Sequence, residues 1–234
     1  MKDHGDLLGI DRPPARGLFV TGTDTGVGKT TVTAALAQRC AQEKWRVAAL
    51  KPIVSGVGKT GYWSDVEILR EASLPPRSFA ETCLYAFDPP LAPHWAAAQA
   101  RVTVDRCKTQ QFITQHSVGM DVVIVEGAGG FLVPLGANWS FADLAMDLQF
   151  SVLLVVGLRL GAINHALLSV EAIRARGLEL VGWVANHLQS DVAAGTLETL
   201  LERMPAPCLG EIPFEPNTLA TVKQRYLSLP ACLY

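Results

Sequence analysis

The feature that most constrains the fold is a glycine-rich loop that joins an apolar segment to a helical one. The apolar segment 17–20 leads into the loop Gly22-Thr-Asp-Thr-Gly-Val-Gly-Lys-Thr-Thr31. Segment 29–44 follows, with apolar residues at helical spacing. We therefore predict a buried strand, a sharp turn and a helix that packs on a sheet.

This loop has the chemistry of a phosphate-binding site. Glycines let the backbone bend so that several N–H groups face one anion, and the positive end of the following helix adds to the attraction. Lys29 is expected to reach the outer phosphates, and the Thr30 hydroxyl is expected to hold Mg²⁺. Five residues separate Gly22 from Gly28, one more than usual, so the loop is a variant of the common motif. The alternative, an ordinary tight turn, is disfavoured by the strand before the loop and the helix after it.

Strands and helices alternate along almost the whole chain. Strands are predicted at 47–50, 121–125, 151–156, 180–185 and 208–212, helices at 65–72, 104–116, 163–176 and 192–203, a short helix near 93–100, and loops at 55–64 and 74–93. This alternation predicts an α/β fold with a mainly parallel sheet and helices on both faces. We predict a single domain, 17–234, preceded by a flexible N-terminal arm, 1–16.

Functional side chains follow several of the predicted strands. Lys51, Glu126 and Asn186 each stand at the carboxyl end of a strand, where ligands bind in such sheets. Lys51 is either a second cation that faces the phosphates or a solvated lysine at a loop start, and the residues alone favour neither. Glu126 suits the acidic metal partner of phosphate-loop enzymes, because an apolar strand carries it to the ligand edge. Asp65 is a second candidate magnesium ligand, although its local spacing favours a helix N-cap.

Composition argues against several classes of protein. The chain has 234 residues, of which 49% are apolar, and its formal net charge of −2 disfavours a broadly basic nucleic-acid binder. The apolar run 151–158 is far shorter than the roughly 20 residues of a membrane-spanning helix, and no targeting segment is visible. Five scattered cysteines without a Cys-x-x-Cys pair favour reduced thiols in a cytoplasmic protein.

Taken in order, these motifs resemble the dethiobiotin synthetase family, ATP-dependent carboxylases of biotin biosynthesis with a P-loop NTPase-like fold. Each matching stretch alone is weak support, whereas the ordered set is highly specific. The stretches are Gly22-Thr-Asp-Thr-Gly-Val-Gly-Lys-Thr30, Lys51-Pro-Ile-Val-Ser-Gly56, Ser64-Asp65, Ala92-Pro-His94, Val125-Glu-Gly-Ala-Gly-Gly130, Gly157-Leu-Arg-Leu-Gly-Ala-Ile-Asn-His165, Gly182-Trp-Val-Ala-Asn186 and Gly210-Glu-Ile-Pro213.

The resemblance implies a three-step reaction. One amine of 7,8-diaminononanoate (7,8-diaminopelargonate) takes up CO₂ as a carbamate, ATP phosphorylates the carbamate to a carbamic–phosphoric anhydride, and the second amine closes the ureido ring and releases phosphate. Mg²⁺ and lysines are needed because a carbamate anion must approach a triphosphate. The resemblance also implies a homodimer with substrate at the interface, where the 157–164 turn of the partner subunit binds the substrate carboxylate.

The resemblance assigns a role to each matching residue. Lys51 and Lys29 are the expected catalytic residues. The expected substrate contacts are Thr25, Lys51 and Ser55, and the expected magnesium ligands are Thr30, Asp65 and Glu126. The expected ATP contacts are Gly26, Val27, Gly28, Lys29, Thr30, Thr31, Asp65, Glu126, Gly127, Ala128, Gly129, Asn186, His187, Pro213, Phe214 and Glu215, with Asn186 on the adenine edge.

Two other functions were weighed against this one. A regulatory ATPase of the deviant-loop group, such as a partitioning protein, usually carries a second lysine early in its loop, where this chain has Thr23 and Asp24. An amidotransferase-linked ligase needs an additional glutaminase domain, for which 234 residues leave no room. Some members of the resembled family carry a glutamate where Gly26 stands, so that side chain has no counterpart here.

Overall fold

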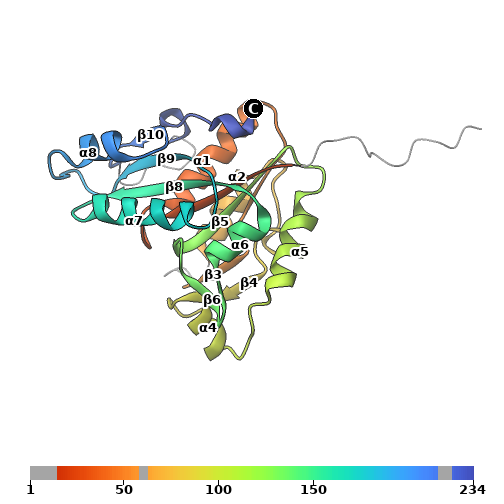
Figure 1. Ribbon diagram of the computed structural model, residues 1–234. Helices are drawn as coiled ribbons and strands as arrows, with labels where there is room; N and C mark the ends of the chain where they lie inside the picture. Colours follow the sequence, from red (N-terminus) through yellow and green to blue (C-terminus); the bar gives the residue numbers. More distant parts are fainter. Residues whose placement is uncertain (1–14, 58–62, 216–222) are drawn as a thin grey trace, which may run out of the picture.

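The central element of the fold is a parallel sheet. The computed structural model describes residues 15–57, 63–215 and 223–234. Within these residues six strands pair in parallel in the order β10-β9-β8-β1-β5-β2 (Figure 1). Their bounds are β1 (Arg16–Gly22), β2 (Val47–Leu50), β5 (Val122–Gly130), β8 (Ser151–Leu158), β9 (Leu180–His187) and β10 (Cys208–Ile212). Strand β1 lies between β5 and β8, so the loop that follows it opens where the winding direction of the sheet reverses.

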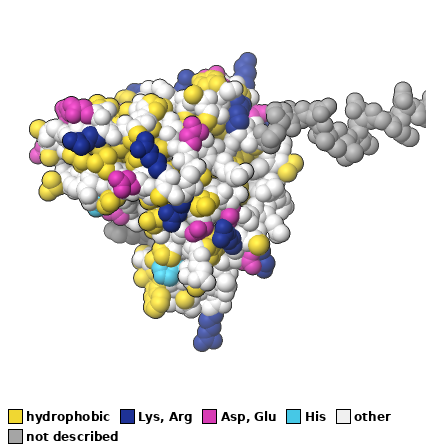
Figure 2. Space-filling model, in the orientation of Figure 1, with side chains coloured by type: hydrophobic (Ala, Val, Ile, Leu, Met, Phe, Trp, Pro, Cys, Tyr) yellow, Lys and Arg dark blue, Asp and Glu magenta, His cyan; other side chains and the backbone are white. Residues whose placement is uncertain are grey.

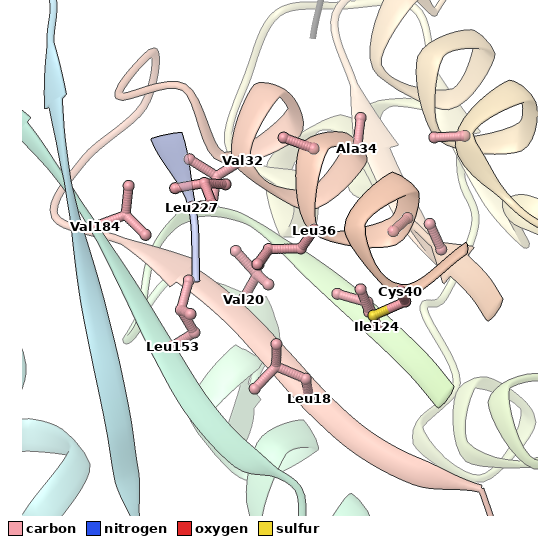
Figure 3. Close-up of a cluster of buried hydrophobic side chains, with 14 of the residues drawn as sticks. Leu18, Val20, Val32, Ala34, Leu36, Cys40, Ile124, Leu153, Val184 and Leu227 are labelled. Atoms are coloured by element: carbon pink, nitrogen blue, oxygen red, sulfur yellow. The ribbon is translucent and has the colours of Figure 1, made fainter. Parts of the chain in front are cut away.

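Helices cover both faces of this sheet. They are α1 (Lys29–Gln42), α2 (Ser64–Ala72), α5 (Arg106–Ser117), α6 (Phe141–Leu148), α7 (Ala162–Arg174) and α8 (Thr196–Arg203). Alternate strand residues point to opposite faces, and both sets are buried. Leu18 and Val20 pack under α1 in the cluster of Figure 3, whereas Phe19 packs with α5 and α6 on the other face. Burial on both faces explains why these strands are apolar without alternation.

Smaller elements surround the central sheet. Strand β3 (Ile53–Ser55) pairs in parallel with β4 (Tyr85–Phe87), and β6 (Pro134–Gly136) pairs with β7 (Trp139–Ser140). The remaining short elements are α3 (Phe79–Thr82), α4 (Pro93–Gln99), η1 (Gln224–Tyr226) and η2 (Ala231–Leu233). The β3–β4 pair and α4 lie together at one end of the molecule (Figure 1). Strand β3 and the first residue of α4 supply part of one wall of the cavity described below.

The α/β fold with a mainly parallel sheet and helices on both faces is confirmed, and several boundaries need correction. The predicted loops 55–64 and 74–93 miss β3, α3 and β4, and the sequence analysis did not include α6. Helix α8 begins at Thr196 and not at residue 192. Strands β5, β8 and β9 continue past their predicted ends, because their glycines and Asn186 still pair in the sheet.

Residues 1–14 of the predicted arm lie outside the described residues, as does part of loop 55–64. Arg16 already belongs to β1, and its guanidinium hydrogen-bonds to the Leu233 carbonyl. In the described part of the chain, every helix is too short or too polar to cross a bilayer. The face drawn in Figure 2 carries acidic and basic side chains interspersed with apolar ones.

Candidate active site

The glycine-rich loop turns sharply between β1 and α1. Gly26 and Gly28 have positive φ angles of 73° and 91°, in the left-handed region that favours glycine. Gly28 is also the N-cap of α1, and a Cβ added to it would lie 2.2 Å from Nδ2 of Asn186. No larger residue fits there without displacing the asparagine. The loop therefore delivers the N-terminal turn of α1, with its unpaired N–H groups, to the ligand edge of the sheet.

Lys29 is the first residue of α1 and is almost fully buried. Its ammonium folds back and donates a hydrogen bond of 2.9 Å to the carbonyl oxygen of Asp24. Burial disfavours the charged form and lowers the pKa of Lys29 to about 8, although Glu126 opposes the shift. A lysine held this way gains stabilisation when a phosphate group arrives.

Sheet register explains why Lys51 and Glu126, which are 75 residues apart, come together. Leu50 of β2 pairs with Val125 of β5, so the residues that follow them are neighbours at the same edge. Val20 of β1 pairs with Glu126, which places the start of the phosphate loop on the other side of the carboxylate. Parallel strands that end together thus bring a lysine, a glutamate and the loop into one site.

Lys51 sits at the centre of this site. Its ammonium donates a hydrogen bond of 2.7 Å to Oε1 of Glu126 and a second one to Oδ2 of Asp65. The Thr30 hydroxyl donates a further hydrogen bond of 2.7 Å to Oε1 of Glu126. Lys51 is 3% exposed and Glu126 is 0% exposed, so this is a buried ion pair. The solvated-lysine interpretation of Lys51 is therefore wrong.

The two carboxylates control the protonation of Lys51. Burial alone would lower the pKa of Lys51, but Glu126 and Asp65 raise it above its ordinary value. Burial in turn favours the neutral acid at Asp65, whereas the Lys51 ammonium holds the pKa of Asp65 below its usual range. Asp65 is the second residue of α2, and Trp63 is the N-cap, so the capping interpretation of Asp65 is also wrong.

A cavity of about 540 Å³ opens over these groups. Its charged lining residues within the described chain are Lys29, Lys51, Asp65 and Glu126, so their charges cancel. The predicted site residues that line it are Thr25, Gly26, Gly28, Lys29, Thr30, Thr31, Lys51, Ser55, Asp65, Glu126, Ala128 and Gly129. Val27 and Gly127 lie beside it in the interior. The site predicted from scattered motifs is thus largely one continuous surface.

The opposite wall of the cavity was missed by the sequence analysis. It consists of apolar residues on α2, on β3, in the segment before α4 and at the start of α4: Val54, Ile68, Pro90, Leu91, Ala92 and Pro93. The Ser55 hydroxyl donates a hydrogen bond of 2.7 Å to the Leu91 carbonyl and so ties β3 to this wall. The one sequence signal for it was the Ala92-Pro-His94 stretch.

A second group of predicted residues lies at the ends of β9 and β10. Nδ2 of Asn186 donates a hydrogen bond of 2.8 Å to the Val27 carbonyl, which fixes the amide against the phosphate loop. His187 lies 2.7 Å from a carboxylate oxygen of Glu211. Pro213, Phe214 and Glu215 follow β10 and do not line the 540 Å³ cavity. Glu215 accepts a hydrogen bond of 2.9 Å from the Tyr226 hydroxyl.

One further contact holds the loop from the side of β8. The Arg159 guanidinium pairs with the Asp24 carboxylate, whose other oxygen accepts a hydrogen bond of 2.7 Å from the Thr25 amide. The Gly157 amide donates a long hydrogen bond of 3.4 Å to the Thr23 hydroxyl. The 157–164 turn therefore braces the phosphate loop, a role that its sequence did not indicate.

The donor set at Thr30, Asp65 and Glu126 suits a magnesium ion. All three residues offer oxygen, which hard divalent cations prefer. Oε2 of Glu126 is buried and has no hydrogen-bond partner among the described residues, which is the environment expected of a carboxylate oxygen that binds a cation. The described residues contain no cluster of three His, Cys, Asp or Glu side chains, so a cation here needs the Thr30 hydroxyl, phosphate oxygens and water to complete its shell.

The chain is similar to known proteins along most of its length. The model of the AAA domain family matches residues 16–221. An ATP-dependent dethiobiotin synthetase BioD of Nitrosospira multiformis is 44% identical over 86% of this chain and 90% of its own length. The BioD protein of Xanthomonas oryzae pv. oryzae is 40% identical over 94% of this chain and 99% of its own length.

Solved structures add the fold alone. The septum site-determining protein MinD of Pyrococcus horikoshii, solved with Mg-ADP, superimposes with a TM-score of 0.56 at 16% identity, over 86% of this chain and 82% of its own. A ParA family ATPase of Chlorobium tepidum gives 0.56 at 13% identity, over 90% of this chain and 89% of its own. Identities this low carry no functional argument for a partitioning ATPase.

Proposed function

The chain belongs to the family of ATP-dependent dethiobiotin synthetases, and we propose how its residues perform the reaction of that family. The reaction is the ATP-dependent ring closure of diaminopelargonate with CO₂ in biotin biosynthesis, and the enzyme is an ATP-dependent ligase. One observation carries the residue roles: two buried lysines and two carboxylates meet at a single cavity beside a phosphate-binding loop.

The first chemical problem is the meeting of two anions. The carbamate oxygen attacks the γ-phosphorus of ATP, the bond from that phosphorus to the bridging oxygen breaks, and ADP leaves. Lys29 binds the outer phosphates at the N-terminus of α1, beside the backbone of 26–31. Lys51 stabilises the carbamate and the transferring phosphoryl group from the end of β2. Fixed cations in a buried site stabilise these anions more strongly than solvated cations do, because little water screens the attraction.

The second problem is ring closure before hydrolysis. The second amine attacks the carbonyl carbon, the new C–N bond forms, and the bond to the phosphate oxygen breaks to release phosphate. The amine proton leaves with the released phosphate, so the step needs no water at the anhydride. Thr25 and Ser55 position the diamine, and the apolar wall of Ile68, Leu91 and Pro93 excludes water from the anhydride.

We propose that Thr30, Asp65 and Glu126 hold Mg²⁺ together with ATP. The buried, unpartnered Oε2 of Glu126 supports this assignment. A bound Mg²⁺ would neutralise phosphate charge and orient the triphosphate. Asn186 remains the proposed contact to the adenine edge, because its amide is fixed beside the loop, with His187, Pro213, Phe214 and Glu215 as proposed neighbours of the base. The cysteines of the described chain are free, which is consistent with the cytoplasm.

We also propose a homodimer with substrate at the interface. A groove of about 460 Å³ lies between the 130–134 segment and α7, and its lining is mostly apolar. Leu132 is 51% exposed, Leu168 is 58% exposed and Leu160 is 90% exposed, so apolar surface is available for a second copy. Light scattering tests this arrangement: the protein should have twice the mass of one chain, and Leu168→Glu should shift it toward the monomer. A monomeric parent protein would refute the dimer and leave the chemistry standing.

Phosphate release tests the proposed function. ATP turnover should require both diaminopelargonate and bicarbonate, with one phosphate released per dethiobiotin formed. The motivating observation is the cation-rich site at Lys51 next to the phosphate loop. Equal ATP turnover without the diamine would favour the switch ATPase instead.

A further inference from the structure

Without a nucleotide, the proposed magnesium ligands already have a cation among them. The Lys51 ammonium contacts Glu126 and Asp65, and Thr30 shares the same glutamate oxygen. Two of the three groups assigned to Mg²⁺ thus contact one –NH₃⁺ group, and the third shares an oxygen with one of them. Among the carboxylate oxygens of this cluster, only Oε2 of Glu126 is buried without a hydrogen-bond partner in the described part of the chain.

Charge balance explains why this arrangement is favoured. Glu126 is 0% exposed, and a buried carboxylate without a counter-charge is costly. Lys51 supplies that charge from within the chain. A divalent cation added to the same carboxylates would lie within a few ångströms of the ammonium, where two positive charges repel strongly because little water screens them.

We propose that Lys51 holds the place of the divalent cation in the nucleotide-free protein, so that the cation binds only together with a nucleotide. The phosphates bring both the charge that the cation requires and new acceptors for the ammonium. Lys51 then leaves the carboxylates for the transferring phosphoryl group, and the metal takes its position. This inference rests on the magnesium site of the proposed function.

A fixed structural ion pair is the alternative. In that case Lys51 would only neutralise Glu126, and its removal would leave metal binding unchanged. The two accounts differ in what happens to a metal in the absence of nucleotide, and this can be measured without turnover.

Titration with Mn²⁺, followed by the electron paramagnetic resonance signal of the free ion, separates the accounts. The wild-type protein should bind Mn²⁺ weakly without nucleotide and at least about tenfold more tightly with ATP in the absence of the diamine, a difference of about 1.4 kcal/mol. Lys51→Met removes the ammonium with little loss of side-chain length, and should raise nucleotide-free Mn²⁺ affinity by about tenfold or more. Adding Glu126→Gln to Lys51→Met should abolish that gain.

Lys29→Met is the matched control. Lys29 is also buried near Glu126, but its hydrogen bond goes to the Asp24 carbonyl and not to the carboxylates. It should raise nucleotide-free Mn²⁺ affinity far less than Lys51→Met does. An equal gain in affinity for the two variants overturns the inference, because the loss of any buried positive charge near the site would then explain the gain.

Two further outcomes overturn the inference. One is tight Mn²⁺ binding by the nucleotide-free wild type, which needs no variant and so does not depend on the folding of Lys51→Met. The other is a folded Lys51→Met protein, checked by circular dichroism, that binds Mn²⁺ no better than the wild type. Neither outcome affects the diamine and bicarbonate requirement that tests the proposed function.

Discussion

The buried pair of Lys51 and Glu126 should dominate the stability of the empty site, and a double-mutant cycle measures it. Lys51→Met leaves a fully buried carboxylate without its ion-pair partner. Removing one partner of a buried pair costs about 3–5 kcal/mol. At about 2–4 °C per kcal/mol for a chain of this size, the melting temperature should fall by about 6–20 °C. Glu126→Gln should cost less, since Lys51 keeps Asp65 as a partner.

The double variant should be more stable than the sum of the single losses predicts. Lys51→Met together with Glu126→Gln removes both charges of the buried pair, so the coupling energy should approach about 2–3 kcal/mol. Urea unfolding at neutral pH, without nucleotide and with a chelator, gives the four free energies of unfolding. Additive losses, or a Lys51→Met cost below about 1 kcal/mol, would refute the reasoning.

A surface pair provides the control for this cycle. Arg39 and Glu43 form an ion pair of 3.3 Å along α1, with both side chains about one third exposed. The same cycle made with Arg39→Met and Glu43→Gln should give a coupling energy of about 0.5 kcal/mol or less, because solvent screens the charges. A similar coupling at both pairs would mean that burial is not the cause.

Two further predictions follow from the loop. Burial lowers the pKa of Lys29 to about 8 in the nucleotide-free protein, and Lys29 must be protonated to bind phosphate. The affinity for ATP should therefore be highest below pH 8 and fall by up to about tenfold per pH unit above it. Calorimetric titration at several pH values measures this profile. Lys29→Arg should flatten that profile, and an unchanged slope would contradict the role of Lys29. Gly28→Ala should cost about 2–5 kcal/mol in urea unfolding, because it adds a clash with Asn186 to the strain of a positive φ. Gly26→Ala should cost only about 1–2 kcal/mol, because φ is positive there but no described side chain or backbone neighbour would lie within 4 Å of the added Cβ. Equal costs for the two variants would show that the clash with Asn186 is not the cause.

The fold was largely predictable because its strands are buried on both faces. A run such as Val122–Val125 leaves little room for another interpretation, and the glycines of the phosphate loop locate the start of α1. Strands β3 and β4 could not be predicted, since each has three residues, which is too few for a period to show. Helix α6 begins with a capping box at Ser140 and Asp143, a local signal that the sequence analysis overlooked.

The site was predictable only in part. Lys51 was expected to face the phosphate loop from the end of its strand, and it does line the cavity with Lys29. Its pairing with Glu126 depends on the register of β2 against β5, which no local pattern encodes. Its pairing with Asp65 depends on how α2 packs. Local spacing alone favoured a helix cap at Asp65, a position that Trp63 occupies, whereas the resemblance assigned Asp65 to magnesium. The apolar wall of the cavity likewise could not be predicted, because it depends on how α2, β3 and the segment around the start of α4 pack together.

Transfer of oxygen from bicarbonate to phosphate tests the central claim most directly. If the site activates a carbamate by phosphorylation, one carbamate oxygen bonds to phosphorus and leaves with it when the ring closes. Brief incubation with ¹⁸O-labelled bicarbonate, ATP and diaminopelargonate, followed by mass spectrometry, should therefore find one ¹⁸O atom in each released phosphate. Phosphate that carries no bicarbonate oxygen, while labelled carbon still enters dethiobiotin, would contradict the account.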